Sequence, residues 1–209
     1  MDKIFTKQNS ELDVDLSVSK SENLEIRINE NSCLKTFALN GFGKLRDLKI
    51  SCGKNTNFTL NFLIKSETNL DLSILLAGEN SSANIKGAYI LDNCNITINT
   101  HQNHLARSTT SSLDIRGLLR NTSKSIYNGK IFIDKIAQFS NATLYNKNIL
   151  LSEEANAISI PSLEVLTEDV KCSHGSAIGP LDKEQLNYLM ARGISPKEAE
   201  SLLLEAFLS

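Results

Sequence analysis

Tryptophan is absent from this sequence, and aromatic residues make up only 6% of its 209 residues. So few aromatic rings argue against a groove that binds carbohydrate. Carboxylates occur at Asp114, Glu164, Glu168 and Asp169, but no pair of them is recognisably placed for acid–base chemistry on a sugar. Polysaccharide chemistry is therefore the weaker of the function classes open to this chain.

Several motifs of catalysis and metal binding are also missing. The four cysteines (Cys33, Cys52, Cys94 and Cys172) are widely spaced and form no Cys-x-x-Cys pair, which excludes a zinc ribbon and a thioredoxin motif. In a domain of this size we expect them to be reduced. The sequence has neither a Gly-x-Ser-x-Gly nucleophile elbow nor a phosphate-binding loop. We predict a protein that is not an enzyme, so that any ATP hydrolysis must come from a partner.

Long apolar runs and a basic stripe are the other absences. The longest apolar runs, such as Ile74–Gly78, are too short to span a bilayer, and the polar N-terminus has no signal-peptide core. The net charge is −2, and the lysines and arginines are scattered, unlike those of a nucleic-acid-binding surface. We expect no membrane and no nucleic acid as partners, and a location in the cytoplasm, with an organelle stroma left open.

Short segments in which apolar and polar residues alternate fill most of the chain. Leu24-Glu-Ile-Arg-Ile28 is one example, and such alternation predicts a strand with one buried face. Clusters of Asn, Ser, Gly and Lys separate the segments and act as turn signals. The predicted strands are Asn23–Asn29, Cys33–Leu39, Leu45–Cys52, Asn57–Ile64, Asn69–Ala77, Ala83–Leu91, Asn95–Thr100, Ser112–Leu119, Ser125–Asp134, Ala142–Ser152 and Ile158–Leu166.

Strands at such even spacing form a sandwich, a barrel or a β-helix, and periodicity alone leaves all three open. Two observations favour the β-helix. Asn128-Gly129 falls within a strand-like segment and therefore does not mark a hairpin turn. No helical pattern interrupts the strands before residue 180 either. We predict a mainly β fold, a right-handed parallel β-helix over residues 1–179, although the repeat does not align to a strict motif.

The pattern changes after Gly179, where two short amphipathic helices are predicted. Asp182 is placed to cap the first helix, and Gly193 is placed at its C-terminus. Ser195-Pro-Lys-Glu198 is the start signal of the second helix. We expect residues 180–209 to form an α-helical hairpin that docks a partner. The apolar face of its second helix would consist of Ala199, Leu202, Leu203, Ala206 and Phe207.

Cys172 and His174 form the only close Cys/His pair of the sequence. They lie at i and i+2 on a predicted strand, so their side chains should point to the same side. A thiolate and an imidazole on one face could share a metal or a nascent iron–sulfur cluster, for which thiolates are the usual ligands and histidine an occasional one. The structural alternative, which spacing alone favours, is that Cys172 packs as a small hydrophobe and His174 hydrogen-bonds a loop.

A second group, His101 and His104 with Cys94 nearby, points less clearly to a metal. His-x-x-His on a helix would suggest zinc, but in a strand or loop residues i and i+3 face opposite ways. We predict a solvated polar segment here.

A series of segments in the C-terminal half carries a family likeness. They are Ile115-Arg-Gly-Leu-Leu119, Ser125-Ile-Tyr-Asn-Gly-Lys-Ile131, Asn146-Lys-Asn-Ile-Leu-Leu-Ser152, Pro161-Ser-Leu-Glu-Val165, Asp169-Val-Lys-Cys-Ser-His-Gly175, Gly179-Pro-Leu-Asp182, Tyr188-Leu-Met-Ala-Arg-Gly-Ile194 and Ala206-Phe207. In this order they resemble the SufB/SufD family, the β-helical scaffold proteins of the SUF iron–sulfur cluster assembly system. Residues 1–90 agree with that family only in strand character.

Within the family the resemblance is to SufD. The SufB branch carries a cysteine important for cluster assembly in the strand that matches Ala142–Ser152, and Asn146 stands at that position here. The wording Asp-Val-Lys-Cys-Ser-His-Gly is the SufD-like form. SufD-like proteins usually have an N-terminal helical domain and continue past the Ala-Phe position, so we expect a shortened SufD-like protein.

The resemblance implies a scaffold role in cluster assembly and a set of partners. A SufB-like protein or a second copy of this chain would cover the open edge of the β-helix, and the final helices would dock a SufC-like ABC ATPase. His174 matches a residue implicated in assembly at the SufB–SufD interface, so His174 and Cys172 are candidates for a cluster-assembly site and His174 for a metal ligand. We expect no tightly bound cofactor, only a transient iron–sulfur cluster at a subunit interface. The alternative is a β-helical carbohydrate-acting enzyme or surface-binding module.

Overall fold

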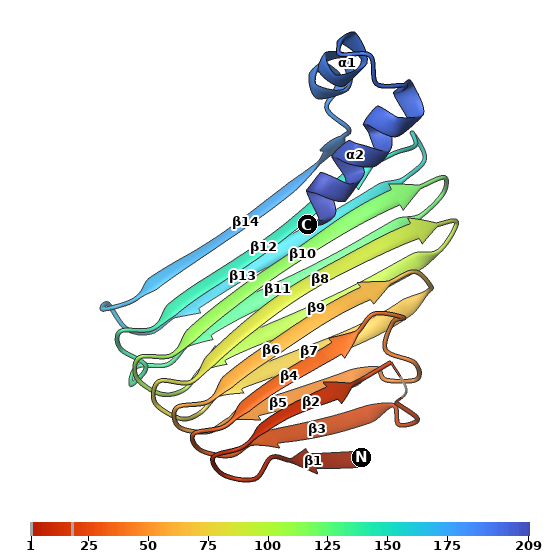
Figure 1. The fold of residues 1–209 in the computed structure, drawn as a ribbon. Coiled ribbons are helices and arrows are strands. Elements are labelled where there is room, and N and C mark those ends of the chain that lie inside the picture. The colour runs from red at the N-terminus through yellow and green to blue at the C-terminus, as the bar shows by residue number, and fades with distance from the viewer. Residues whose placement is uncertain (1, 18) are drawn as a thin grey trace.

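The computed structural model describes residues 2–17 and 19–209 and contains two parallel β-sheets wound into a solenoid, with two helices at the C-terminus (Figure 1). Each sheet has seven strands, the odd-numbered strands in sheet A and the even-numbered strands in sheet B. The prediction of a parallel β-helix followed by a helical pair is confirmed. The elements are β1 (Asp2–Phe5), β2 (Glu11–Asp15), β3 (Asn23–Ile28), β4 (Cys33–Ala38), β5 (Asp47–Cys52), β6 (Asn57–Ile64), β7 (Thr68–Leu76), β8 (Ser82–Asp92), β9 (Asn95–His104), β10 (Thr110–Arg120), β11 (Lys124–Ile133), β12 (Asn141–Leu150), β13 (Asn156–Val165), β14 (Lys171–Pro180), α1 (Lys183–Ala191) and α2 (Pro196–Leu208).

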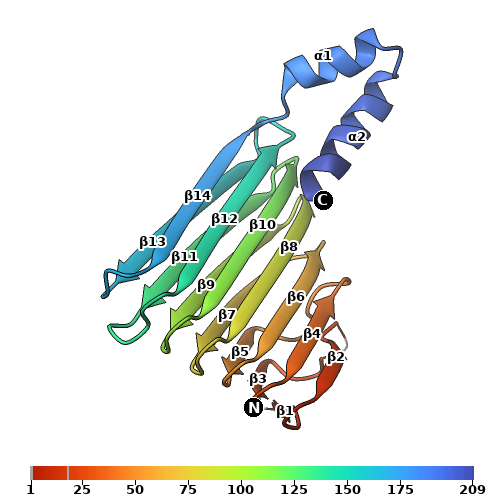
Figure 2. The same cartoon turned by 60° about the vertical axis from the view of Figure 1, so that its left-hand side comes forward.

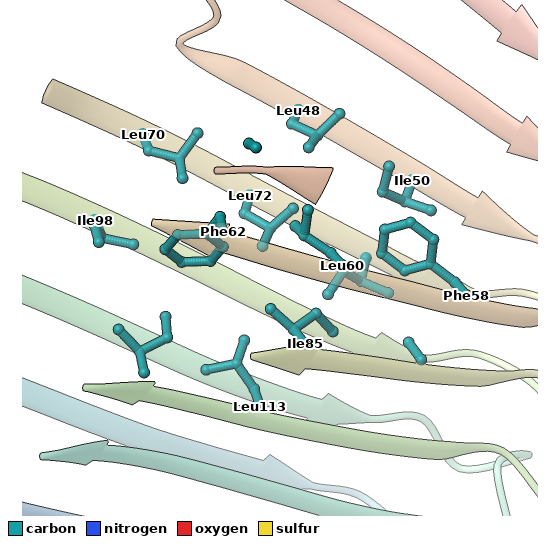
Figure 3. Close-up of a cluster of buried hydrophobic side chains, with 14 of the residues drawn as sticks. Leu48, Ile50, Phe58, Leu60, Phe62, Leu70, Leu72, Ile85, Ile98 and Leu113 are labelled. Atoms are coloured by element: carbon teal, nitrogen blue, oxygen red, sulfur yellow. The ribbon is translucent and has the colours of Figure 1, made fainter. Parts of the chain in front are cut away.

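The hydrophobic core lies between the two sheets and takes every second side chain of each strand. In β6, Phe58, Leu60 and Phe62 are buried, while the residues between them face outward. Figure 3 shows this layer, with Leu48 and Leu72 of sheet A among the same cluster. Full burial of such a side chain contributes about 1.5–3 kcal/mol. The alternating pattern in the sequence is therefore the direct cause of the two-layer fold.

Each of the first six turns from sheet A to sheet B contains one residue in the left-handed backbone conformation. Asparagine occupies this position in the first four turns, with φ between 53° and 59°, because its short polar side chain tolerates that conformation. The side-chain amide of Asn55 donates to Asn31 at 2.9 Å, and that of Asn80 donates to Asn55 at 3.1 Å. A ladder of asparagines thus runs across the turns. The left-handed residues are Asn9, Asn31, Asn55, Asn80, Ser108 and Phe139.

The coils lengthen along the chain, which explains why no strict repeat is visible in the sequence. Successive left-handed residues are 22, 24, 25, 28 and 31 positions apart. The strands grow accordingly, from four residues in β1 to eleven in β8 and β10. The solenoid is narrow at its N-terminal end and wide at its C-terminal end (Figure 2).

The structure adds strands that the alternation pattern misses. β1 and β2 are only four and five residues long, and in each a single apolar residue, Ile4 or Val14, packs against the core. β9 extends to His104 instead of ending at Thr100. Its inward positions change from isoleucine to Thr100, Gln102 and His104, so the period of two persists while the apolar signal disappears.

The helical hairpin forms with the predicted caps. The Asp182 carboxylate accepts from the backbone N–H of Glu184 at 2.8 Å, and the Ser195 hydroxyl accepts from that of Glu198 at 3.4 Å. Gly193, with φ of +90°, ends α1. Of the two helices in the part of the chain that the structure covers, neither is long and apolar enough to cross a membrane.

The helix α2 divides its apolar residues between a covered and an exposed side. Its buried residues are Ala199 and Leu204, whereas Leu202 and Ala206 are exposed. The difference arises because α2 lies along the outer face of sheet B and contacts β10, so sheet B and not the helix pattern alone decides which side is covered (Figure 2).

Candidate functional site

Cys172 and His174 lie on β14, the last strand of sheet B. β14 pairs in parallel with β12, with Cys172 opposite Ala142 and His174 opposite Leu144. Both of these β12 residues are fully buried in the core. Cys172 and His174 therefore point to the inner face of the solenoid, and the prediction that they share one side is confirmed.

That inner face is uncovered at the C-terminal end of the solenoid. Within the described chain no strand pairs with the outer edge of β13 or β14. Leu163 on β13 is in line with buried Ile131, yet it is 40% exposed, and Ile178 on β14 is in line with buried Asn148, yet it is 42% exposed. We use the term open-end face for these inner-face residues of the last coil: Leu163, Val165, Cys172, His174 and Ile178.

The open-end face contains apolar side chains as well as the Cys/His pair. Val165 aligns with buried Ile133 in the same way as its neighbour Leu163 aligns with Ile131. Sequence reasoning identified the Cys/His pair but not these apolar side chains. The signal was available, since the predicted strand Ile158–Leu166 has inward apolar positions and nothing in the sequence beyond it supplies another strand of sheet A.

Cys172 and His174 differ in their surroundings. The Cys172 side chain packs partly against the core, and burial raises the pKa of its thiol. A metal would have to displace that proton to gain a thiolate ligand. His174 is exposed and makes no side-chain hydrogen bond to any residue that the structure describes. Its imidazole is therefore free to meet a ligand or a partner.

Gly175, which follows His174, has a packing role. A Cβ at this position would lie 3.0 Å from two ring atoms of Tyr145 on β12, tighter than ordinary contacts. The Tyr145 ring thus covers the outer side of β14 at Gly175, beside the strand position from which His174 points inward. The glycine of the Lys-Cys-Ser-His-Gly segment is explained by this close contact.

Asn146 stands where the SufB branch is expected to have a cysteine, and it is fully buried. Its side-chain nitrogen donates to the Ile115 carbonyl at 3.2 Å, and its oxygen accepts from the Asn148 amide at 2.9 Å. Asn148 in turn accepts from the Tyr89 hydroxyl. A neutral amide network occupies this part of the core, so the position offers no thiolate.

The second histidine group does not form a site, and the prediction of a solvated segment is wrong for His104. His101 is exposed on the outer face of β9, whereas His104 is fully buried. Its Nδ1 lies 2.7 Å from the Thr109 hydroxyl and its Nε2 lies 2.8 Å from the Ser111 hydroxyl. Burial lowers the pKa of His104 to about 4. Cys94 packs partly against the core.

The described residues form neither a metal-binding cluster nor a row of stacked aromatic rings. Among residues 2–17 and 19–209, no three of the His, Cys, Asp and Glu side chains are grouped closely enough to hold a metal ion. Exposed aromatic rings do not form a stacked row on sheet B: Phe37 and Tyr145 share one column of outward positions, but Asn61, Lys86 and Asp114 lie between them. This arrangement gives no support to a carbohydrate-binding groove.

Comparison with known proteins gives a consistent family. The chain is 30% identical over 154 residues to the iron–sulfur cluster assembly protein SufD of Escherichia coli, which covers 73% of this chain and 36% of that protein. It is 33% identical over 106 residues to SufD of Bacillus subtilis, covering 51% of this chain and 24% of that protein. An iron–sulfur cluster assembly SufBD family protein of Synechocystis is 36% identical over 84 residues, covering 40% of this chain and 18% of that protein.

The chain thus spans between 18% and 36% of the length of these relatives. The match at family level is far more extensive. The family model for the SufBD core domain of SUF-system FeS cluster assembly matches residues 4–207, which includes both sheets and the helical hairpin. By fold, by the Cys/His segment on β14 and by this match, the chain belongs to the SufBD family of the SUF iron–sulfur cluster assembly system.

Proposed function

We propose that this chain is a SufD-like, non-catalytic scaffold subunit that assists iron–sulfur cluster assembly together with a SufB-like partner and a SufC-like ATPase. One observation carries the proposal. Cys172 and His174 lie on the inner face of the last coil, which is apolar and uncovered at the wide end of the solenoid. Relatives named SufD in two bacteria support the SufD-like assignment. A cytoplasmic location, or an organelle stroma, follows as part of the same proposal.

The open-end face is the surface that the SufB-like partner, or a second copy of this chain, would cover. β14 has only one charged residue that resists pairing, Lys171 at its start. β2 at the opposite end reads Glu-Leu-Asp-Val-Asp, and charged side chains discourage edge-to-edge pairing. Burial of the exposed leucine, valine and isoleucine of the open-end face would stabilise the complex by the hydrophobic effect.

His174 and Cys172 would provide part of a cluster-assembly site at that interface. Iron–sulfur clusters usually take four protein ligands, so two side chains can hold a cluster only together with a partner. His174 is accessible now, whereas Cys172 must first lose the proton that burial favours. We therefore assign the main role to His174, with Cys172 beside it, and regard the cluster as transient cargo and not as a resident cofactor.

The helical hairpin would dock the ATPase. A separate ATPase is needed in this proposal because the sequence has no phosphate-binding loop. α1 has no buried residue, and Tyr188 is 60% exposed. A groove between the helices is lined by Leu189 and Leu203 and bordered by acidic Asp182 and Glu184. Such a groove fits an apolar knob flanked by basic side chains on the partner.

The test is an anaerobic co-purification of the chain with SufB- and SufC-like proteins from the same cell, followed by optical spectroscopy. Wild type is expected to form a ternary complex with iron–sulfur absorption. His174→Ala should keep the complex and lose most of that absorption. His101→Ala is the matched control, since His101 is an exposed histidine on the outer face of β9, remote from β14 in the strand order.

Each outcome has a defined meaning. Equal absorption in wild type and His174→Ala would remove His174 from cluster assembly and leave a purely structural subunit. Equal loss in His174→Ala and His101→Ala would indicate a non-specific effect. Failure of the wild type to bind either protein would overturn the scaffold proposal itself.

A further inference from the structure

α2 is held against the outer face of β10 by two arginines of that strand. The Arg116 guanidinium donates to the backbone carbonyl of Phe207 at 2.5 Å, and its Cζ lies 5.9 Å from the centre of the Phe207 ring. Four residues further along β10, Arg120 forms an ion pair with Glu200 at 3.2 Å. Leu204, between the two helix positions, is buried.

The spacing of these contacts defines how the helix lies. Contacts move from residue 207 to residue 200 of α2 as β10 advances from residue 116 to residue 120, so α2 runs antiparallel to β10. Four residues of a strand span about 13 Å, and seven residues of a helix span about 10 Å. The two pairs are therefore similar in length and hold α2 at residues 200 and 207.

The hairpin forms a strap between two strands of sheet B. Only Leu181 and Asp182 separate the end of β14 from α1, and α1 packs on α2. The chain thus leaves the last coil, reverses in the hairpin and returns along α2 to β10, which is separated from β14 by β12 (Figure 2). The strand that carries His174 is connected through the hairpin to an interior strand of the same sheet.

Arg116 is the stronger of the two attachments. Its guanidinium is oriented by the Asp114 carboxylate through two hydrogen bonds, at 2.9 and 3.1 Å, while it donates to Phe207. The side chains of Arg116 and Asp114 are only 25% and 26% exposed, against 45% and 39% for Arg120 and Glu200. Solvent screening makes the exposed pair weak, whereas a charge-assisted bond in a sheltered position is stronger.

We propose that Arg116 is a positioning residue that anchors the helical hairpin on β10 and thereby limits the motion that reaches β14. The proposal rests on the proposed function, in which the hairpin docks an ATPase. With Arg116 in place, a force on the hairpin passes into β10, which is paired on both sides. Without it, the force passes through the short link at residues 181–182 into β14, the edge strand of the open-end face.

Hydrogen exchange of the free 209-residue chain tests the anchor directly. Loss of a charge-assisted hydrogen bond should speed exchange in the C-terminal half of α2 about tenfold in Arg116→Ala. Exchange in β14 should rise with it, while β4, β6 and β8 stay unchanged. Arg120→Ala is the matched control and should change exchange in α2 by less than about threefold. Arg116→Lys should restore part of the protection, because it keeps the charge beside Asp114.

An unchanged exchange rate of α2 in Arg116→Ala would overturn the proposal. A faster rate in α2 together with an unchanged rate in β14 would overturn it as well. Faster exchange in every strand would also overturn it, since Arg116 would then support the fold in general. The same experiment with the SufC-like protein separates the two proposals. If that protein fails to bind the wild-type chain, the proposed function fails, while exchange in the free protein still decides the role of Arg116. If the SufC-like protein binds, the change in hydrogen exchange that it causes in β10 of the wild-type chain should disappear in Arg116→Ala.

Discussion

Polar side chains replace aliphatic ones in the core where the coils are widest. His104 bonds Thr109 and Ser111 through both ring nitrogens, and the Thr109 hydroxyl lies 2.7 Å from that of Ser140 in the next coil. Thr100 and Tyr127 share a hydrogen bond of 2.7 Å. Buried polar groups of this kind stabilise a fold only while every member has a partner. His104, whose two ring nitrogens both have partners, and Gln102, whose side chain has none among the described residues, test that rule.

His104 should make stability depend on pH. Burial lowers its pKa from 6.5 to about 4, so the folded state keeps it neutral. Above pH 6.5 the imidazole is neutral in both states and adds no pH dependence. As pH falls from 6.5 to 4 the unfolded chain gains a proton that the folded chain does not, and stability decreases, by about 3 kcal/mol at most. Urea unfolding at pH 7 and pH 4.5 measures this loss.

The control variants separate His104 from other titrating groups. His104→Gln should flatten the dependence between pH 6.5 and 4.5, whereas His101→Gln, at an exposed position, should leave it as in wild type. Glu25, whose pKa the Arg27 and Lys3 side chains lower, loses its stabilising charge only as pH falls below 4.5. An unchanged slope in His104→Gln would contradict the assignment.

Gln102 should cost stability instead of adding to it. It is fully buried, and neither its side-chain oxygen nor its nitrogen has a hydrogen-bond partner among the described residues. Its neighbours in register are Ile74 and Ile131. Because an unsatisfied buried polar group costs about 1–3 kcal/mol, Gln102→Leu should raise the free energy of unfolding by about 1 kcal/mol or more.

Thr100→Val is the matched variant for this measurement. It lies on the same strand and faces the same core, but it removes a hydroxyl that is bonded to Tyr127. We expect it to lower the free energy of unfolding by about 1 kcal/mol. Destabilisation by both variants in urea titrations would mean that Gln102 has a partner in solution.

At the scale of elements, the turns between the sheets differ in the residue that takes the left-handed backbone conformation. Four turns have asparagine in the left-handed position, but the turn before β12 has Phe139, with φ of +64° and an exposed ring. A bulky residue in this conformation costs about 1–2 kcal/mol. The contact of the Arg107 guanidinium with the Phe139 ring, at 5.1 Å, returns about 0.5–1 kcal/mol at an exposed site.

The backbone cost at Phe139 exceeds the contribution of its contact with Arg107. Phe139→Asn should therefore stabilise the protein by about 0.5–1 kcal/mol, since asparagine tolerates the conformation. Thermal unfolding followed by circular dichroism would measure it. Asn55→Ala is the opposite change at the equivalent position of another turn. It removes the hydrogen bonds to Asn31 and Asn80 and should lower the melting temperature. A lower melting temperature for Phe139→Asn would mean that the ring stabilises the turn more than its backbone conformation costs.

For the whole molecule, the two ends of the solenoid are physically different. The N-terminal end is narrow, with short strands rich in charge, and the C-terminal end is wide, with an uncovered apolar inner face. The proposed association through the C-terminal end would cover these apolar residues. It would also place the Cys/His pair inside the contact and not on a free surface.

Leu163→Glu should abolish association through the open-end face without unfolding the chain. A charge in the centre of an apolar contact cannot be buried without a partner. Ile126→Glu is the control, because Ile126 is also 40% exposed but lies on the outer face of β11. Analytical ultracentrifugation, with and without a SufB-like protein, should show loss of the complex for the first variant only. Equal binding by both variants would place the interface elsewhere.

The sequence alone predicts the local features of this protein because nearby residues determine them. Alternation sets the strands, and β6 is found over the predicted range Asn57–Ile64. Asp182, Gly193 and Ser195 set the ends of the helices through their own side chains or backbone conformation. The i, i+2 spacing of Cys172 and His174 puts both on one face of a strand wherever that strand lies.

Tertiary structure decided what depends on neighbours distant in the chain. His104 is buried because the coil that contains it is covered on both sides, although its sequence context is polar. α2 buries Leu204 and exposes Leu202 because β10 meets only one side of it. Leu163 and Ile178 have the pattern of core residues but are exposed, since no further coil of the described chain covers them. Side-chain periodicity fixes which face a residue takes, whereas only the stacking of coils determines whether that face meets protein or solvent.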